Sequence, residues 1–112
     1  RAALEAIAFQ VADVFEAMQK DLGVSLSGLS VDGGASRNDF LMQFQADVLD
    51  RRVTRGSVAE LSAVGAAMMA RSGLGRSAWP ATDALEFEPS MSQESRDVLR
   101  TRWAGALSRT LI

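Results

Sequence analysis

The segment LSVDGGASRNDF, residues 29–40, contains the transitions on which the fold depends. A short apolar run ends at Asp32, two glycines follow, and Ser36 with Asp39 has the spacing of a helix capping box. This series predicts a strand, a tight turn and the start of a helix. Glycines here let a ligand approach the main chain, and free N–H groups at a helix start attract a negative or hydrogen-bonding partner. A double glycine alone, however, is more typical of a plain tight turn.

On the N-terminal side, a continuous apolar stripe predicts a helix that ends near Gly23, where a left-handed cap costs no Cβ clash. The stripe advances in steps of three and four residues through Leu4, Ile7, Ala8, Val11, Val14, Phe15, Met18 and Leu22. Residues 24–31 then predict a strand of about five residues that ends at the glycines.

On the C-terminal side, a second stripe predicts a helix after the turn, with Phe40, Leu41, Phe44, Val48 and Leu49 in the core. Residues 51–54 are well placed for a second strand, and Ser57 with Glu60 resembles a capping box ahead of a helix that ends near Gly73. This alternation predicts an α/β fold with few strands covered by helices, and the two strands as parallel neighbours. Two strands are too few for a stable sheet.

The remaining residues, 73–112, predict a long irregular surface connection and a terminal helix that starts near Ser90 and Gln93. Trp79 and Trp103 are expected to be local packing anchors, and the methionines at 68 and 69 are expected in the core. The arginines of the terminal helix are interpreted mostly as a solvated face; they are Arg96, Arg100, Arg102 and Arg109.

Composition excludes several classes of function. The 112 residues suit one folded domain, with 47% hydrophobic and 23% charged residues. The 12 Lys and Arg are dispersed and outweighed by 14 Asp and Glu, so no nucleic-acid partner is expected. Without cysteine or histidine there is no disulfide, thiolate metal site or imidazole catalysis. No apolar run of about 18 residues and no signal-peptide pattern is present, so no membrane partner and a cytoplasmic setting are expected.

The string VDGGASRNDFLMQFQADVL, residues 31–49, resembles the adenosine-binding motif of the FGGY carbohydrate kinases, and of the glycerol kinases among them. Residues 1–18 resemble the helix that precedes this motif, and residues 58–70 resemble the helix that follows it. The resemblance implies part of a ribonuclease H-like, actin-like ATPase C-terminal domain. In it, residues 1–72 would belong to the nucleotide-binding domain, and residues 73–112 would add a connection and a terminal helix to the same domain.

The resemblance also implies roles for individual residues. Gly33 and Gly34 would line the adenine and ribose of ATP through their main chain, and Asn38 would supply a side-chain amide to the nucleotide. The plain alternative for Asn38 is a polar residue at a helix start. For Asp32, accepting hydrogen bonds from the turn amides is at least as good an interpretation as nucleotide contact. The small residues 63–67 resemble a hinge motif, and no residue is assigned to catalysis or to metal binding.

A full-length parent would be an ATP- and Mg²⁺-dependent kinase that transfers the γ-phosphate of ATP to a hydroxyl of glycerol. The phosphate loops, metal site, catalytic aspartate and polyol pocket would lie in preceding sequence, so this chain alone is expected to be inactive. The start on Arg1 fits a fragment, although tag removal or processing would also produce it. Two alternatives stay open: another FGGY sugar kinase, such as one for a pentulose, and a free-standing non-catalytic α/β module that binds a nucleotide or a protein. The apolar stripe of the first predicted helix and the edges of the sheet would be left uncovered in this chain, so self-association is a further expectation.

Overall fold

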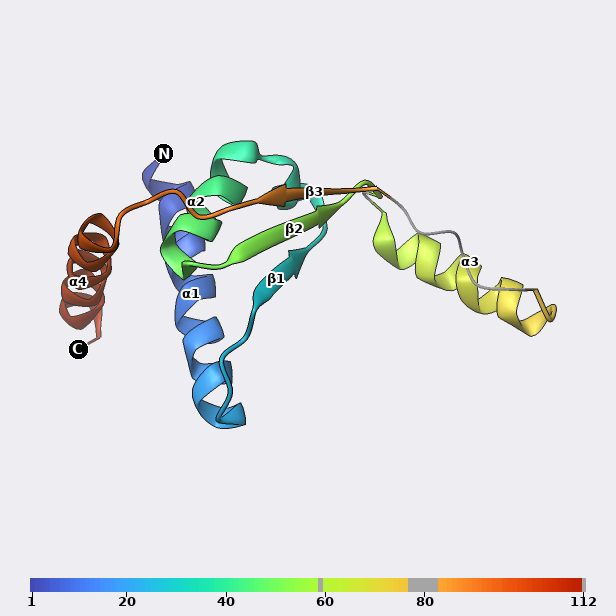
Figure 1. Cartoon of the computed structure of the whole chain (residues 1–112), viewed down its shortest axis with the longest axis horizontal. Helices are drawn as coiled ribbons and strands as arrows, with labels where there is room; N and C mark the ends of the chain where they lie inside the picture. Colours follow the sequence, from blue (N-terminus) through green and yellow to red (C-terminus); the bar gives the residue numbers. More distant parts are fainter. Residues whose placement is uncertain (59, 77–82, 112) are drawn as a thin grey trace.

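The computed structural model describes residues 1–58, 60–76 and 83–111. Its elements in chain order are α1 (Ala2–Leu22), β1 (Gly28–Val31), the 3-10 turn η1 (Gly34–Arg37), α2 (Asp39–Leu49), β2 (Arg52–Gly56), α3 (Leu61–Gly73), β3 (Ala84–Phe87) and α4 (Gln93–Thr110). Figure 1 shows the sheet at the centre beside α1 and α2, with α4 at one end of the molecule and α3 extending from the other.

The sheet has the strand order β1-β2-β3. β1 and β2 are parallel neighbours, as the sequence predicted, and Leu29 lies opposite Val53. β3 is antiparallel to β2 and places Phe87 opposite Val53, so the prediction of an irregular connection after residue 73 is wrong for residues 84–87. A strand of four residues is too short to show a periodic pattern, and it provides the third strand that a stable sheet requires.

Helix α2 packs on the sheet, α1 packs on α2, and Leu29 and Val31 of β1 join Val53 at the core that they form. The buried core consists of Ala8, Phe9 and Ala12 from α1, Leu41, Met42, Phe44, Ala46 and Val48 from α2, and Val53 from β2. Phe40 was predicted in this core but is 40% exposed, and its ring stacks on Phe44 at the edge of the core, at a centroid distance of 5.9 Å.

Helix α1 ends as predicted, with Gly23 as a left-handed cap at φ 66°. Its predicted apolar stripe divides in two. Ala8 and Phe15 are buried, together with Phe9 and Ala12, which the stripe did not include. The exposed members are Ile7, Val14, Met18 and Leu22. The helix is therefore apolar over a wider arc than α2 and the sheet cover.

Helix α3 contains no buried residue among those described. Met68 and Met69 are 42% and 78% exposed, so their predicted core positions are wrong in this chain, where α3 extends away from the sheet (Figure 1). Glu60 is the N-cap and makes no side-chain capping bond, so the predicted capping box with Ser57 does not form. The helix ends at Gly73 as expected, and Trp79 lies outside the described residues.

Helix α4 begins at Gln93, as expected, but its N-cap is Ser92 rather than Ser90, and the Ser92 hydroxyl accepts from the Ser95 N–H at 3.2 Å. Trp103 is the packing anchor that the sequence predicted. Its ring stacks on Phe9 at a centroid distance of 5.2 Å, and its Nε1 donates to Asp13 Oδ2 at 2.8 Å.

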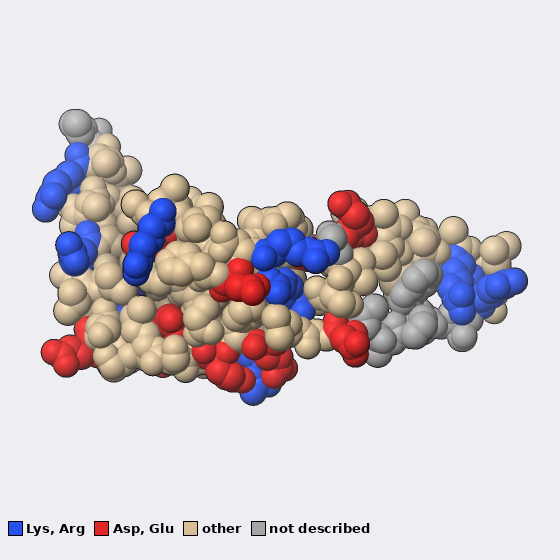
Figure 2. Space-filling model, turned by 90° about the horizontal axis from the view of Figure 1, so that it is seen from above, with Lys and Arg blue, Asp and Glu red and all other residues tan. Residues whose placement is uncertain are grey.

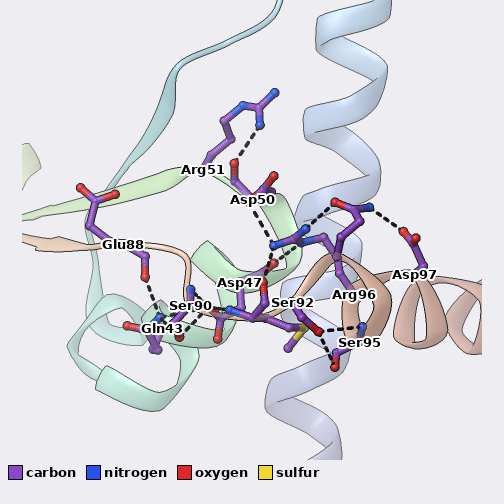
Figure 3. Close-up of polar contacts among 12 residues, drawn as sticks. Gln43, Asp47, Asp50, Arg51, Glu88, Ser90, Ser92, Ser95, Arg96 and Asp97 are labelled. Carbon is purple, nitrogen blue, oxygen red and sulfur yellow. Dashed lines mark hydrogen bonds and ion pairs between the residues drawn. The ribbon is translucent and has the colours of Figure 1, made fainter.

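The interpretation of the α4 arginines as a solvated face is wrong for two of them. Arg96 is only 7% exposed and donates to the main-chain oxygen of Asp47, the carboxylate of Asp50 and the main-chain oxygen of Met91 (Figure 3). Arg100 forms ion pairs with Asp13 and Glu16 of α1. The error arises because charged residues are usually exposed, and nothing in their spacing indicates carboxylates or carbonyls contributed by distant segments.

Candidate functional site

The turn between β1 and α2 is closed by contacts onto Gly33. This residue has φ 84° and ψ 176°, a left-handed conformation that favours glycine. Its main-chain oxygen accepts from the N–H of Ser36 at 3.2 Å and from the Ser36 hydroxyl at 2.6 Å. Because Ser36 is used in this way, the capping box predicted for Ser36 and Asp39 is wrong, and the cap of α2 lies two residues further on.

Gly34, the first residue of η1, faces open space. A Cβ built on it would meet no protein atom within 4 Å. The fold itself therefore does not require glycine at this position, whereas a molecule lying against the main chain would.

Asn38 is the N-cap of α2. Its Oδ1 accepts from the Leu41 N–H at 3.0 Å, so the plain interpretation of a polar helix-start residue is confirmed. Since the oxygen serves the main chain, the amide nitrogen is the atom that remains. The side chain is exposed, and no described residue accepts a hydrogen bond from that nitrogen. A cap and a ligand donor are therefore compatible in this one side chain.

Asp32, which precedes the two glycines, plays no part in closing the turn. Asp32 is exposed, and no residue in the described ranges donates a hydrogen bond to its carboxylate, so the predicted acceptor role for the turn amides is wrong. Arg55 of β2 does contact the turn, through the main-chain oxygen of Ser36 and the carboxylate of Asp39. A single arginine at the end of a short strand gave no signal from which this contact could be predicted.

A shallow hollow of about 340 Å³ lies beside Asn38 and is also lined by Arg1, Leu4 and Phe40. A larger one, about 580 Å³, lies elsewhere, against β1 and β2 and the start of the segment after β3. Its lining includes Ser30, Thr54 and the paired charges of Arg52 and Glu86. We place the candidate site at the turn, because there an open glycine and a helix N-terminus with a spare amide donor coincide.

Within residues 1–58, 60–76 and 83–111, no group of three or more His, Cys, Asp or Glu is placed to hold a metal ion. The same ranges contain no helix long and apolar enough to cross a membrane. Figure 2 shows basic and acidic side chains interspersed over the face that it displays, without one continuous basic surface.

Comparison with known proteins shows a family. Residues 1–74 match the C-terminal domain of the FGGY family of carbohydrate kinases. Glycerol kinase of Deinococcus radiodurans is 51% identical over 97% of this chain, and that of Dechloromonas aromatica is 52% identical over 99%. In both cases the match covers 23% of the relative, so the chain spans less than a quarter of the length of these enzymes.

Two solved structures are similar over nearly the whole chain. Plasmodium falciparum glycerol kinase with ADP has a TM-score of 0.82 and 29% identity, and covers 100% of this chain and 24% of its own. Xylulose kinase from Rhodospirillum rubrum has a TM-score of 0.72 and 30% identity over 99% of this chain and 24% of its own. Both have the actin-like ATPase fold, which confirms the predicted fold class. The chain belongs to the FGGY family of carbohydrate kinases and is a C-terminal part of such a protein.

Proposed function

We propose that this chain is the adenosine-binding C-terminal portion of an ATP-dependent kinase that phosphorylates glycerol. The observation that carries the proposal is the turn at residues 33–38, where Gly34 opens onto free space and Asn38 keeps a spare amide donor. The similarity to glycerol kinases at about half identity supports the choice of reaction, and the similarity to a glycerol kinase with ADP supports a nucleotide as the ligand.

In this proposal the main chain of Gly33 and Gly34 lies against the adenine and ribose, and the Asn38 amide donates a hydrogen bond to the nucleotide. Residues 1–72 belong to the nucleotide-binding domain, and residues 73–112 belong to the same domain. The pairing of β3 with β2 and the packing of Trp103 on Phe9 support that assignment, because both join the second segment to the first.

Phosphoryl transfer also needs positioned phosphates, Mg²⁺ and a residue that accepts the proton of the attacking hydroxyl. We assign these parts, and the polyol pocket, to the portion of the polypeptide outside this chain. The chain by itself is then inactive, and the longer protein acts in the cytoplasm on ATP and glycerol. The exposed apolar residues of the α1 stripe support two further parts of the proposal. This surface is covered by other residues in the longer protein, and it promotes self-association of the present chain.

The proposal is tested by calorimetric titration of ADP into the chain and into Gly34→Ala. The added Cβ meets no protein atom, so the variant folds normally but places a methyl group where the nucleotide would lie. We expect an affinity loss of about tenfold or more, which corresponds to about 1.4 kcal/mol of binding free energy, because the methyl group would clash with the nucleotide. Gly65→Ala on α3 is the matched control, because its Cβ also meets nothing within 4 Å. Equal ADP affinity in all three proteins would contradict the proposal.

A second candidate is a kinase for a pentulose, favoured by the similarity to a xylulose kinase. An assay of the full-length polypeptide that carries this chain, with ATP, Mg²⁺ and either glycerol or xylulose, distinguishes the two candidates. ADP release that depends on glycerol supports the first candidate, and release that depends only on xylulose supports the second.

A further inference from the structure

Arg55 connects the central strand of the sheet to the turn that holds Gly34 and Asn38. It lies on β2 directly opposite Val31, the last residue of β1 before the turn. Its side chain is 15% exposed, and the guanidinium carbon lies 5.2 Å from the centre of the Phe87 ring on β3. The packing of the guanidinium against this ring restricts its orientation from the sheet side.

Two hydrogen bonds of this guanidinium reach residues on either side of Asn38 in the sequence. Arg55 Nη1 donates to the main-chain oxygen of Ser36 at 2.6 Å and to Asp39 Oδ1 at 2.9 Å. Ser36 in turn donates its hydroxyl to the oxygen of Gly33. One side chain of β2 is thus linked, directly or through Ser36, to the beginning and the end of the turn.

The two bonds are not equal in weight. The side chain of Asp39 is 74% exposed, so its ion pair with Arg55 is screened by water and contributes little. Ser36 is 4% exposed, and its oxygen accepts from a charged donor away from water. A 3-10 turn has poor internal hydrogen-bond geometry, so an external donor has a large effect on its order. The contact with Ser36 is therefore the one that fixes the turn.

We infer that Arg55 is a positioning residue for the nucleotide-binding turn, and that its bond to the Ser36 carbonyl sets adenosine affinity without contacting the nucleotide. The inference rests on the proposed function for its nucleotide readout. Its structural part, that Arg55 orders the turn, has a readout that needs no ligand.

The test compares Arg55→Gln with Arg52→Gln. Arg52 is on the same strand and also carries ion pairs, to Glu86 and Glu88, but neither of these partners lies in the turn, which makes it a matched control. In the ligand-free chain, hydrogen exchange of the amides of residues 35–38 should accelerate about tenfold or more in Arg55→Gln. It should not change in Arg52→Gln. ADP affinity should fall by a similar factor in the first variant alone.

Two further variants separate the two bonds. Asp39→Asn removes the ion pair but keeps the Ser36 contact, so it should alter exchange and affinity by less than about threefold. Arg55→Lys keeps one charged donor and should recover part of both effects. If Arg55→Gln proves too unstable to purify, Arg55→Lys and Asp39→Asn still test the inference. The inference requires faster exchange of the turn amides and weaker ADP binding in Arg55→Lys than in Asp39→Asn.

The outcomes distinguish this inference from the proposed function. Turn amides that exchange at the same rate in Arg55→Gln and Arg52→Gln overturn the inference even where ADP binds. Fast exchange in Arg55→Gln alone, with no ADP binding to the unaltered chain, retains the ordering role and overturns both the nucleotide function and the affinity role of Arg55.

Discussion

Arg96 Nε donates a 2.6 Å hydrogen bond to the main-chain oxygen of Asp47, so a buried cation of α4 closes the C-terminal end of α2 (Figure 3). The last carbonyls of a helix lack partners within the helix, and a positive charge there is favourable. The same guanidinium also pairs with the carboxylate of Asp50, the C-cap of α2. Helix α2 therefore has its N-terminus capped by Asn38 and its C-terminus covered by α4.

Replacing Arg96 by Met should lower the free energy of unfolding by about 3 kcal/mol, because the main-chain oxygens of Asp47 and Met91 would both lose their charged donor. Urea denaturation measures the change. Arg102→Met, on the exposed side of the same helix, is the control and should cost less than about 0.5 kcal/mol. Equal losses in the two variants would show that Arg96 is not a structural contact.

Trp103→Phe should cost about 1 kcal/mol, because the ring can still stack on Phe9 but the donor to Asp13 is lost. Trp103→Ala should cost about 3 kcal/mol, since the stack is also removed. The two values come from thermal or urea unfolding of each variant. Similar losses for Phe and Ala would mean that the ring packing contributes nothing measurable.

Gly33→Ala should destabilise the chain by about 1 to 3 kcal/mol, because an alanine would have to adopt φ 84°. Gly34→Ala should change stability by less than about 0.5 kcal/mol, since its Cβ meets no protein atom. The pair thus separates a glycine needed by the fold from one left open for a ligand. A larger loss at Gly34 than at Gly33 would reverse this assignment.

Asn38 allows its two roles to be measured separately. Asn38→Ala removes the cap and should cost about 1 kcal/mol, whereas Asn38→Asp retains a capping oxygen and should leave stability nearly unchanged. Neither variant has the amide donor, so both should bind ADP more weakly. If Asn38→Asp bound ADP as well as the unaltered chain, the amide would have no ligand role.

Local patterns predicted a large part of this fold. The helix end at Gly23 follows from residues close together in the chain, and the parallel arrangement of β1 and β2 follows from the helix that connects them; the structure confirms both. Residues 31–49 likewise indicated the family before the comparison did, because that stretch carries a specific motif.

The features that were missed depend on partners far away in the sequence. β3 forms by pairing with the edge of β2. Arg96 is buried by its contacts with Asp47 and Asp50, which lie 49 and 46 residues earlier in the sequence. Met68 was assigned to a core that this chain does not complete around α3. Local spacing contains no information about such contacts.

The central claim is that the turn at residues 33–38 binds adenosine nucleotides, and titration of ADP into the isotope-labelled chain tests it most directly by NMR. We predict saturable shifts at the Gly33 and Gly34 amides and at the side-chain amide of Asn38, with the amides of α3 unchanged. Absence of saturable shifts at these three residues, or shifts confined to the hollow around Ser30 and Thr54, would contradict it.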